Sequence, residues 1–483
     1  MDPATLALTG QLPFVILAAA VAAFPSSLLL LRLYRRGVIR AMGRRAPADI
    51  AQVLPVQSEF PAPRNALNPP RLVVSEWEAT RSREECANYL FDRLHASPWQ
   101  GARLYALGGV AFTLLMTLAV LISSGMDLLP VRLLLVFWVY GWPIVLTLNL
   151  VGASSQRDRW LTIAGYFVGL VVLSAAAVKT SAELTLAQVA SLWMITNLPP
   201  TLLLFAFLAR PIRAVGPLVL AFMILAFTGS LLALAMAASH EGVLRTAAGI
   251  AFTLGANAAG TFLAIVLVGF LPFAVLGWLA VRWLRRGYIS KRLSDQSISI
   301  DSLWLLFGIV QSVGVAFEGA LWILSGVLAF MAYKLTVWAG FRWRPAQTSA
   351  GQHPNTRLLL LRVFSLGKRS ERLFDGVTKH WRYLGNVQLI AGPDLAMTTV
   401  EPHEFLSFVG GGLARSFIDG PQALDARMND LDVNPDVDGR FRVNDFFCYD
   451  DTWEMVLTRL VKESDVVMMD LRGFSPQNAG CVH

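Results

Sequence analysis

The stretch that decides the fold class of the C-terminal part is SDVVMMDLRGFSPQNAGCVH, residues 464–483. Its apolar run, Asp465 to Leu471, is followed by Arg472, a glycine and a Ser-Pro pair. This pattern is typical of a buried parallel strand that ends in a polar loop. In open α/β sheets, ligands bind in the loops at the carboxyl ends of the strands. The stretch therefore predicts an α/β domain with a ligand-binding edge.

Residues 357–463 continue the same pattern upstream. Short apolar runs alternate with longer segments of helical pattern. We expect strands at 357–364, 386–391, 440–448 and 465–471, and helices at 371–383, 402–418 and 451–462. Strands that alternate with helices form right-handed crossovers and a parallel sheet between helical layers. The predicted fold of residues 357–483 is therefore a three-layer α/β domain with a parallel sheet.

The rest of the chain has the composition of a membrane protein. Of the 483 residues, 55% are hydrophobic and 15% are charged, whereas a soluble domain has about 25% charged residues. Apolar segments of roughly twenty residues, each long enough to cross a bilayer, recur along the chain. After a first segment at Leu12–Leu31, such segments begin near Leu104, Leu133, Trp160, Val189, Val215 and Ala258. We expect a polytopic α-helical bundle of seven spans before residue 300.

The distribution of basic residues predicts the orientation. If the N-terminus is outside, only Arg132, Lys179 and Arg245 of the Lys and Arg residues before position 300 lie outside. Cytoplasmic loops are enriched in Lys and Arg, so this asymmetry favours an outside N-terminus. We expect a multi-pass protein of the plasma (inner) membrane with a cytoplasmic C-terminal domain.

The apolar stretch before the tail allows two interpretations. Residues 300–342 are about twice a span in length, with Glu318-Gly319 near the middle. A hairpin that turns at Glu318 and a re-entrant segment would both leave the tail cytoplasmic, and we favour the hairpin. The expected units are 1–31 (first transmembrane helix), 32–103 (cytoplasmic loop with a Pro-rich linker and an amphipathic helix), 104–299 (spans two to seven), 300–342 (hairpin or re-entrant segment), 343–356 (linker) and 357–483 (α/β domain).

Roughly the last 125 residues of the chain also resemble a known family. The run from Asp451 to Cys481, a helix, an "SDVV" strand, a loop with Ser475 and a helix opening at a cysteine, resembles the later half of a TIR-type domain. The resemblance implies a flavodoxin-like fold and NAD or another nucleotide as ligand. The catalytic glutamate of that pattern would fall at position 484, so the resemblance leaves enzymatic activity open. Residues 477–483 begin a helix, and we expect the domain to continue beyond His483. A bundle joined to such a tail also resembles bacterial multi-pass membrane proteins.

Seven polar residues at the strand ends form the predicted ligand site. Cationic side chains near helix N-termini suit phosphate, and carboxylates at neighbouring strand ends suit ribose hydroxyls. The site residues are Lys368, Arg369, Asp394, Asp451, Asp470, Arg472 and Ser475. The alternative interpretation is that these residues are solvated loop charges and helix caps.

Metal and nucleic-acid sites are not predicted. Asn434 to Asp445 resembles a calcium loop, but Pro435, two arginines and an Asp at the twelfth place argue against one, and we expect an acidic surface turn. The three cysteines are scattered and provide neither a disulfide framework nor zinc spacing. Residues 351–483 have a net charge of −4, from 14 Lys and Arg against 18 Asp and Glu, which argues against nucleic acid as a partner.

These observations lead to one main functional hypothesis and two alternatives. The main hypothesis is a membrane protein that presents a TIR-like cytoplasmic domain for nucleotide or partner sensing in signalling or defence, with homo-oligomers forming through that domain. The first alternative is a membrane-anchored hydrolase of NAD or a related nucleotide. The second is a transporter with a regulatory tail, against which the scarcity of charged residues within the spans argues.

Overall fold

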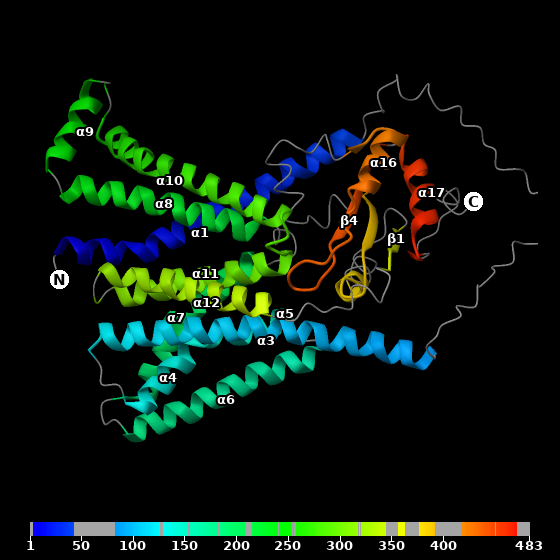
Figure 1. Cartoon of the computed structure of the whole chain (residues 1–483). Helices are drawn as coiled ribbons and strands as arrows, with labels where there is room; N and C mark the ends of the chain where they lie inside the picture. The colour runs from blue at the N-terminus through cyan, green and yellow to red at the C-terminus, as the bar shows by residue number, and fades with distance from the viewer. Residues whose placement is uncertain are drawn as a thin grey trace, which may run out of the picture.

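The computed structural model describes residues 3–42, 83–125, 129–152, 155–180, 184–207, 215–239, 241–253, 255, 257–316, 318, 320–343, 356–362, 376–391, 417–449 and 451–470. These residues form a helical bundle and a smaller parallel sheet at one end of it (Figure 1). The chain's first helix starts at the end of the bundle that lies away from the sheet.

The bundle consists of long apolar helices. Their bounds are α1 Pro3–Met42, α3 Arg83–Ser123, α4 Pro130–Tyr140, α5 Trp142–Val151, α6 Gln156–Thr180, α7 Leu186–Phe207, α8 Gly216–Ser239, α9 Glu241–Thr253, α10 Ala258–Ile289, α11 Asp295–Ala316 and α12 Leu324–Trp343, with a 3₁₀ turn η1 at Ala320–Ile323. Within the described ranges, eight helices are long and apolar enough to cross a membrane. The pair α4 and α5, bent by 42°, would make a ninth span. The prediction of several apolar helices with the length and composition of membrane spans is therefore confirmed.

Two segments refine the predicted spans. Residues 300–342 include most of α11 and all but the last residue of α12, with Glu318 in a turn between the two helices. Of the expected cytoplasmic amphipathic helix around residues 74–94, the described part from Arg83 onward is continuous with the span of α3. Both α1 and α3 have about 40 residues, roughly 60 Å at 1.5 Å per residue, which is twice the thickness of a bilayer core.

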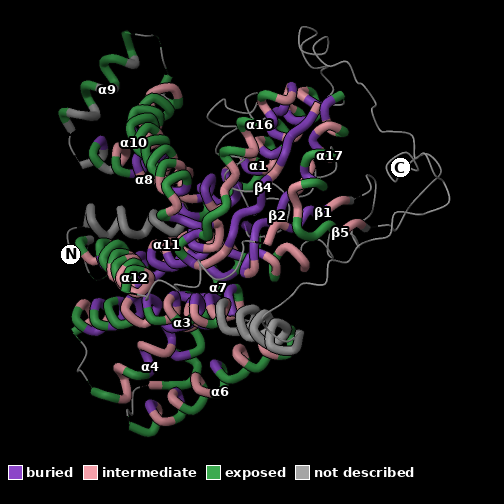
Figure 2. Tube along the Cα trace, turned by 45° about the vertical axis from the view of Figure 1, so that its right-hand side comes forward, coloured by how far each residue is buried: buried purple, intermediate pink, exposed green. Residues whose placement is uncertain are grey.

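Helix α11 lies at the centre of the bundle. In its most apolar window 61% of the residues are buried, whereas only 11% are buried in that of α10. Figure 2 shows the same contrast, with exposed outer faces on α10 and buried residues along the middle of the bundle. The exposed residues of α10 include Val268 and Trp283, as expected of a helix that faces lipid.

Glycine pairs allow the helices to approach closely. Gly308 of α11 faces Gly326 of α12, and a Cβ on Gly326 would lie 2.2 Å from the Gly308 carbonyl oxygen. Gly229 of α8 and Gly269 of α10 form a similar contact, with each added Cβ 2.4 Å from the other's oxygen. In lipid the hydrophobic effect does not drive helices together, so such small residues let van der Waals contact do so.

The tail contains a five-stranded parallel sheet. Its strands are β1 Leu358–Arg362, β2 Val387–Ala391, β3 Phe417–Ile418, β4 Val443–Cys448 and β5 Val466–Asp470, in the spatial order β3-β4-β2-β1-β5. The four predicted strands and the parallel pairing are confirmed. The prediction of a helix over 402–418 is wrong at its end, where Phe417 and Ile418 form β3; residues 402–416 lie outside the described part of the chain.

Side chains of β1 alternate between two apolar clusters. Leu359 packs with Ile418, Phe446 and residues of α16 (Pro421–Asn429) and α17 (Trp453–Glu463). Leu358 and Leu360 pack with Val387, Val443 and, from the helical residues 376–381, Val377 and Trp381. This alternation follows from the two-residue period of a strand. Because both faces of β1 are covered, its sequence is an uninterrupted apolar run.

The spatial order of the strands differs from the implied flavodoxin-like order. In that order the first strand lies between the second and third strands. Here β1 lies between β2 and β5, and β4 is on the other side of β2. The order β4-β2-β1-β5 corresponds instead to the 3-2-1-4 part of the other doubly wound arrangement, with β3 added at the edge. The point at which the strand order reverses is therefore between β1 and β5.

Candidate functional site

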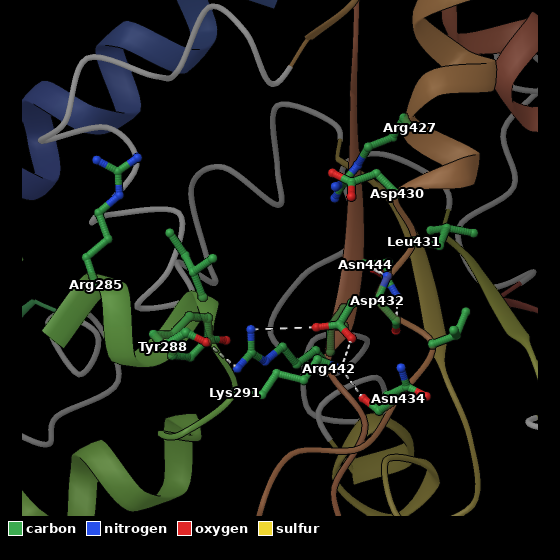
Figure 3. Close-up of a pocket in the computed structure, with 13 residues that line it drawn as sticks. Arg285, Tyr288, Lys291, Arg427, Asp430, Leu431, Asp432, Asn434, Arg442 and Asn444 are labelled. Carbon is green, nitrogen blue, oxygen red and sulfur yellow. Dashed lines mark hydrogen bonds and ion pairs between the residues drawn. The ribbon is translucent and has the colours of Figure 1, made fainter. Parts of the chain in front are cut away.

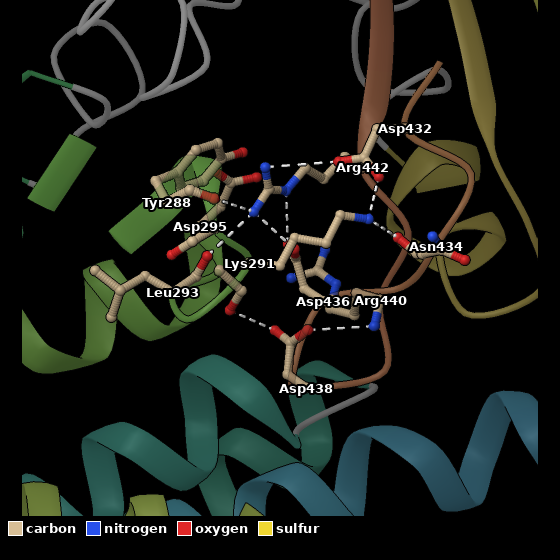
Figure 4. Close-up of polar contacts among 12 residues, drawn as sticks. Tyr288, Lys291, Leu293, Asp295, Asp432, Asn434, Asp436, Asp438, Arg440 and Arg442 are labelled. Carbon is tan, nitrogen blue, oxygen red and sulfur yellow. Dashed lines mark hydrogen bonds and ion pairs between the residues drawn. The ribbon is translucent and has the colours of Figure 1, made fainter. Parts of the chain in front are cut away.

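The sheet contacts the bundle through a loop that follows α16. We call residues 430–442 the clamp loop, because it holds the turn between α10 and α11 (Figure 4). This turn carries part of the basic segment before residue 300, and the clamp loop carries Asp430, Asp432, Asp436 and Asp438. Opposite charges thus meet where the sheet domain reaches the membrane helices.

Arg442, which directly precedes β4, is the centre of the contact. Its Nε donates to Asp436 Oδ2 at 3.0 Å, and its Nη2 lies 2.7 Å from Oδ1 as an ion pair. A third nitrogen lies 3.6 Å from Asp432 Oδ2. The planar fork of arginine matches a carboxylate in this two-point geometry, which lysine cannot reproduce.

Arg442 also completes the end of a membrane helix. Its Nη2 donates to the backbone oxygen of Tyr288 at 2.7 Å and to that of Leu293 at 3.3 Å, and the guanidinium lies 3.8 Å from the centre of the Tyr288 ring. The last carbonyl groups of a helix lack intrahelical partners and carry partial negative charge. A cation from the sheet domain therefore satisfies the C-terminal end of α10.

Lys291 occupies an uncommon backbone conformation at the same turn. Its φ of 58° is left-handed, and the amides of Lys291 and Arg292 bond to the oxygens of Tyr288 and Gly287, which is a Schellman motif. Glycine is the usual residue at such a position because it has no Cβ. The Lys291 ammonium forms an ion pair with Asp432 and donates to the Asn434 oxygen at 2.5 Å. The ion pair with the sheet domain accounts for a lysine here.

Ser294 connects the start of α11 to the clamp loop. Its hydroxyl accepts from the amide of Ser297 at 3.0 Å, which is an N-cap, and donates to Asp438 Oδ2 at 2.7 Å. Next to it, Asp295 accepts from Arg382 Nη2 at 2.9 Å, and Arg382 Nε donates to the Phe441 oxygen. Both helix ends at the turn are thus capped with the help of residues from the sheet domain.

Burial makes these charges sensitive to their partners. Asp436 and Asp438 are 5% and 3% exposed, so the expectation of an acidic surface turn is wrong. Burial raises the pKa of Asp436 to about 6; Arg442 opposes the rise, and Asp438 and Asp295 add to it. The carboxylates bind Arg442 and Ser294, and in the described ranges no group of three or more His, Cys, Asp or Glu side chains is arranged to hold a metal.

The N-terminal helix provides an apolar contact with the same domain. Tyr34, Val38 and Met42 on the last turns of α1 pack against Phe417 of β3 and Phe447 of β4. The Phe417 ring lies 5.5 Å from that of Phe447. Because α1 is too long for the bilayer alone, its final turns can cover this end of the sheet.

The predicted strand-end residues fall mostly outside the described part of the chain. Lys368, Arg369, Asp394, Arg472 and Ser475 lie there, as does Cys481. Asp470 is the last residue of β5, and Asp451 is exposed before α17. The carboxyl ends of β5 and β4 are separated by β1 and β2, so these two carboxylates are not at adjacent strands.

Two polar groups in the bundle bear on the transport alternative. Asn197 donates to the Val139 oxygen and Tyr166 to the Trp138 oxygen, each at 3.0 Å, and both carbonyls lie at the bend between α4 and α5. Asp301, which is not among the predicted site residues, pairs with Lys334 and accepts from the Tyr333 hydroxyl at 3.2 Å. The asparagine and tyrosine satisfy a broken helix, and the charges satisfy each other, which are structural roles.

Reasoning from the sequence did not identify the clamp. The sequence does contain one indication of this contact: residues 430–438 are acidic and the turn at 285–292 is basic. These two segments are about 145 residues apart, so nothing local connects them. The chain matches no family model, no curated protein and no solved structure. Functional arguments therefore depend on the geometry of the chain itself.

Proposed function

We propose that this chain is a multi-pass membrane protein that senses a nucleotide or a partner through its sheet domain and transmits binding to the bundle through the clamp loop. Two observations together carry the proposal. The strand order reverses between β1 and β5, whose carboxyl ends would form the binding site, and the polar clamp lies at the amino ends of the strands. The reversal offers a binding crevice, and the clamp offers a connection to the membrane helices.

The crevice is proposed between β1 and β5. These strands pair in parallel, and their last residues, Arg362 and Asp470, are partners in the register. In doubly wound sheets ligands bind outside the carboxyl ends of the strands where the order reverses. Lys368 and Arg369 follow β1, and Arg472 and Ser475 follow β5. Four of the seven predicted site residues thus belong to the two segments that leave the sheet at this point.

The orientation of the sheet supports access from the aqueous phase. Arg442 precedes β4 and Arg382 precedes β2, and both contact the α10–α11 turn. The amino ends of the strands therefore face the bundle, and the carboxyl ends point away from it. A soluble nucleotide could approach the proposed crevice without entering the bilayer.

The clamp provides a mechanism for transmission. Because β4 begins immediately after Arg442, a shift of the sheet would change the distances to Asp436, Tyr288 and Leu293. Packed, charged contacts of this kind have discrete arrangements rather than continuous ones. We propose that ligand binding shifts the population of such arrangements and thereby moves α10 against α11.

The finer assignments are part of the same proposal. The two apolar clusters on β1 support a three-layer α/β arrangement, and the 21-to-3 distribution of basic residues supports a cytoplasmic location at the inner membrane. The TIR resemblance supports a role in signalling or defence, although the strand order argues against its flavodoxin-like part.

The test is nucleotide binding by the full chain in lipid nanodiscs. ATP and NAD are the probes, and binding is measured by calorimetry on the wild type and on the double variant Lys368→Ala, Arg369→Ala. The matched control is Lys462→Ala, a cation in the last turn of α17, which ends just before β5 begins and therefore lies at the amino ends of the strands. Binding of either probe that the double variant weakens about tenfold or more, and the control does not, supports the proposal. Failure of both probes to bind the folded wild type refutes nucleotide sensing.

A further inference from the structure

A cavity separates the end of α10 from the sheet domain on the side away from the proposed crevice (Figure 3). Its volume is about 480 Å³, and it opens beside the clamp loop. The lining includes Arg285, Tyr288 and Lys291 from α10 and its turn, and Arg427, Asp430 and Asp432 from the end of α16 and the loop after it. The cavity is thus formed jointly by a membrane helix and the sheet domain.

The charges that line the cavity are predominantly positive. Four cationic side chains, Arg285, Lys291, Arg427 and Arg442, face two carboxylates, Asp430 and Asp432. Asp432 is already paired with Lys291 and Arg442. The remaining cations outnumber the remaining carboxylate, so an anion would be attracted to the cavity.

Two of the arginines have no carboxylate partner in the described part of the chain. Arg427 donates to the Asp445 backbone oxygen at 3.3 Å and lies over the Phe446 ring. Arg285 extends from α10 on the opposite side of the cavity, as Figure 3 shows, and forms no hydrogen bond or ion pair with a residue in the described ranges. Guanidinium groups that line one cavity from two sides are suited to the several oxygens of a phosphate group.

Aromatic and basic residues at the ends of α10 and α12 indicate how deep the cavity lies relative to the membrane. One turn before Arg285, Arg282 stacks on Trp278 at 5.7 Å, and the neighbouring Trp283 is 65% exposed. At the end of α12, Arg342 stacks on Trp338 in the same way at 5.4 Å. Tryptophan and arginine at helix ends mark the boundary between the hydrocarbon and the headgroups. A phosphate of the bilayer surface would therefore reach the cavity at the right depth.

We infer that this cavity binds a phosphate-bearing anion at the membrane surface, with Arg285 and Arg427 as its principal ligands. The group would bridge α10 and α16 and so reinforce the clamp from its outer side. An anionic phospholipid headgroup and a soluble phosphate ester share this chemistry. This site is distinct from the proposed crevice at the carboxyl ends of the strands and does not depend on it.

The experiment measures lipid and phosphate binding by the full chain in detergent, using native mass spectrometry. The probes are phosphatidylglycerol, phosphatidylcholine and soluble glycerol phosphate. We expect phosphatidylglycerol to be retained in preference to phosphatidylcholine. Competition by glycerol phosphate at comparable concentrations would identify a soluble phosphate as the source, and its failure to compete would identify the lipid. Retention of neither anionic probe above phosphatidylcholine would overturn the inference.

Variants on the two sides of the cavity locate the site. Arg285→Gln and Arg427→Gln are each expected to weaken retention about fivefold, because a cation near a phosphate contributes about this factor. Arg286→Gln, an exposed neighbour on the same helix that does not line the cavity, is the matched control. If one cavity variant does not fold, the other decides. Equal loss in the Arg286 variant would indicate a diffuse basic surface and overturn the assignment.

Discussion

The close approach of α11 to α12 and the contact between the bundle and the sheet domain depend on different kinds of residue. The helices meet at Gly308 and Gly326, where the absence of side chains allows the backbones to touch. The sheet domain meets the bundle through Arg442, Asp436 and Lys291, which are long or charged side chains. At the glycine contact shape decides how closely the helices approach, and the Asp301–Lys334 ion pair joins the same two helices nearer their other ends. At the sheet domain, charged side chains make most of the polar contact.

The comparison shows which contact should tolerate which change. A close glycine contact fails when any atom is added, and it is insensitive to pH and salt. A buried ion network fails when one partner is removed, because the other charge is then left without compensation. The following experiments test this difference, starting with the largest expected effect.

Replacing Arg442 by Ala should have the largest effect. The change leaves Asp436 buried without its main partner and removes a donor from the Tyr288 oxygen. Removing one member of a buried ion pair costs about 3–5 kcal/mol. Hydrogen exchange in nanodiscs should then show faster exchange at the α10–α11 turn and at β4.

Arg459→Ala is the matched control for this variant. Arg459 is 49% exposed at its side chain and pairs with Glu463 one turn away at 2.6 Å. A surface pair of this kind contributes less than about 1 kcal/mol. Equal exchange in the two variants would show that the clamp contributes no more than a surface pair.

The clamp should also respond to pH through Asp436. Because its pKa is about 6 in the folded protein and 3.8 ordinarily, the folded state binds more protons between these values. Stability should therefore fall as the pH rises from about 4 to 6, by about 3 kcal/mol at 1.36 kcal/mol per pKa unit, and then stay level. Unfolding measured over pH 4–7 checks the slope. Asp436→Asn should flatten it, and an unchanged slope in this variant would assign the titration to another group.

Gly326→Ala tests the glycine contact. The added Cβ would lie 2.2 Å from the Gly308 oxygen, and a backbone atom cannot move away without separating the helices. Overpacking of this kind costs about 1–3 kcal/mol, visible as a lower midpoint of thermal unfolding in detergent at every pH. Gly314→Ala on α11, where nothing lies within 4 Å of the new Cβ, is the control and should not lower the midpoint. A pH-dependent loss in the Gly326 variant would contradict the proposed contrast.

Lys291 combines a charged contact with a backbone constraint and should show the smallest effect. Lys291→Gly and Lys291→Ala both remove the ion pair with Asp432, but only glycine relieves the left-handed backbone. The glycine variant should be more stable than the alanine variant by about 1 kcal/mol. Thermal unfolding of the two variants side by side measures this difference. Equal stabilities would mean that the backbone at this turn is not strained.

Local patterns in the sequence were sufficient to predict most of the elements. Apolar runs such as Ile300–Trp338 and Asp465–Leu471 predicted helical spans and a strand, because burial in lipid or in a parallel sheet excludes polar residues over a continuous stretch. The strand order was not predictable in this way. The sequences of β1, β2 and β5 are all largely apolar, and an apolar sequence does not indicate which strand lies beside it.

The contact between the clamp loop and the α10–α11 turn depends on the tertiary structure. The segment around Asp436 and Asp438 is acidic and contains proline and glycine, which is typical of a solvated turn. Nothing in its sequence indicates that the two carboxylates are buried. Their burial is accompanied by hydrogen bonds from Arg442 to Asp436 Oδ2 and from Ser294 to Asp438 Oδ2, and Ser294 and Asp438 come from distant parts of the chain. The sequence by itself therefore determined which segments enter the membrane and which form the sheet, since both follow from local hydrophobicity. How the two parts meet depended on pairing between distant charges, which only the folded chain brings within reach.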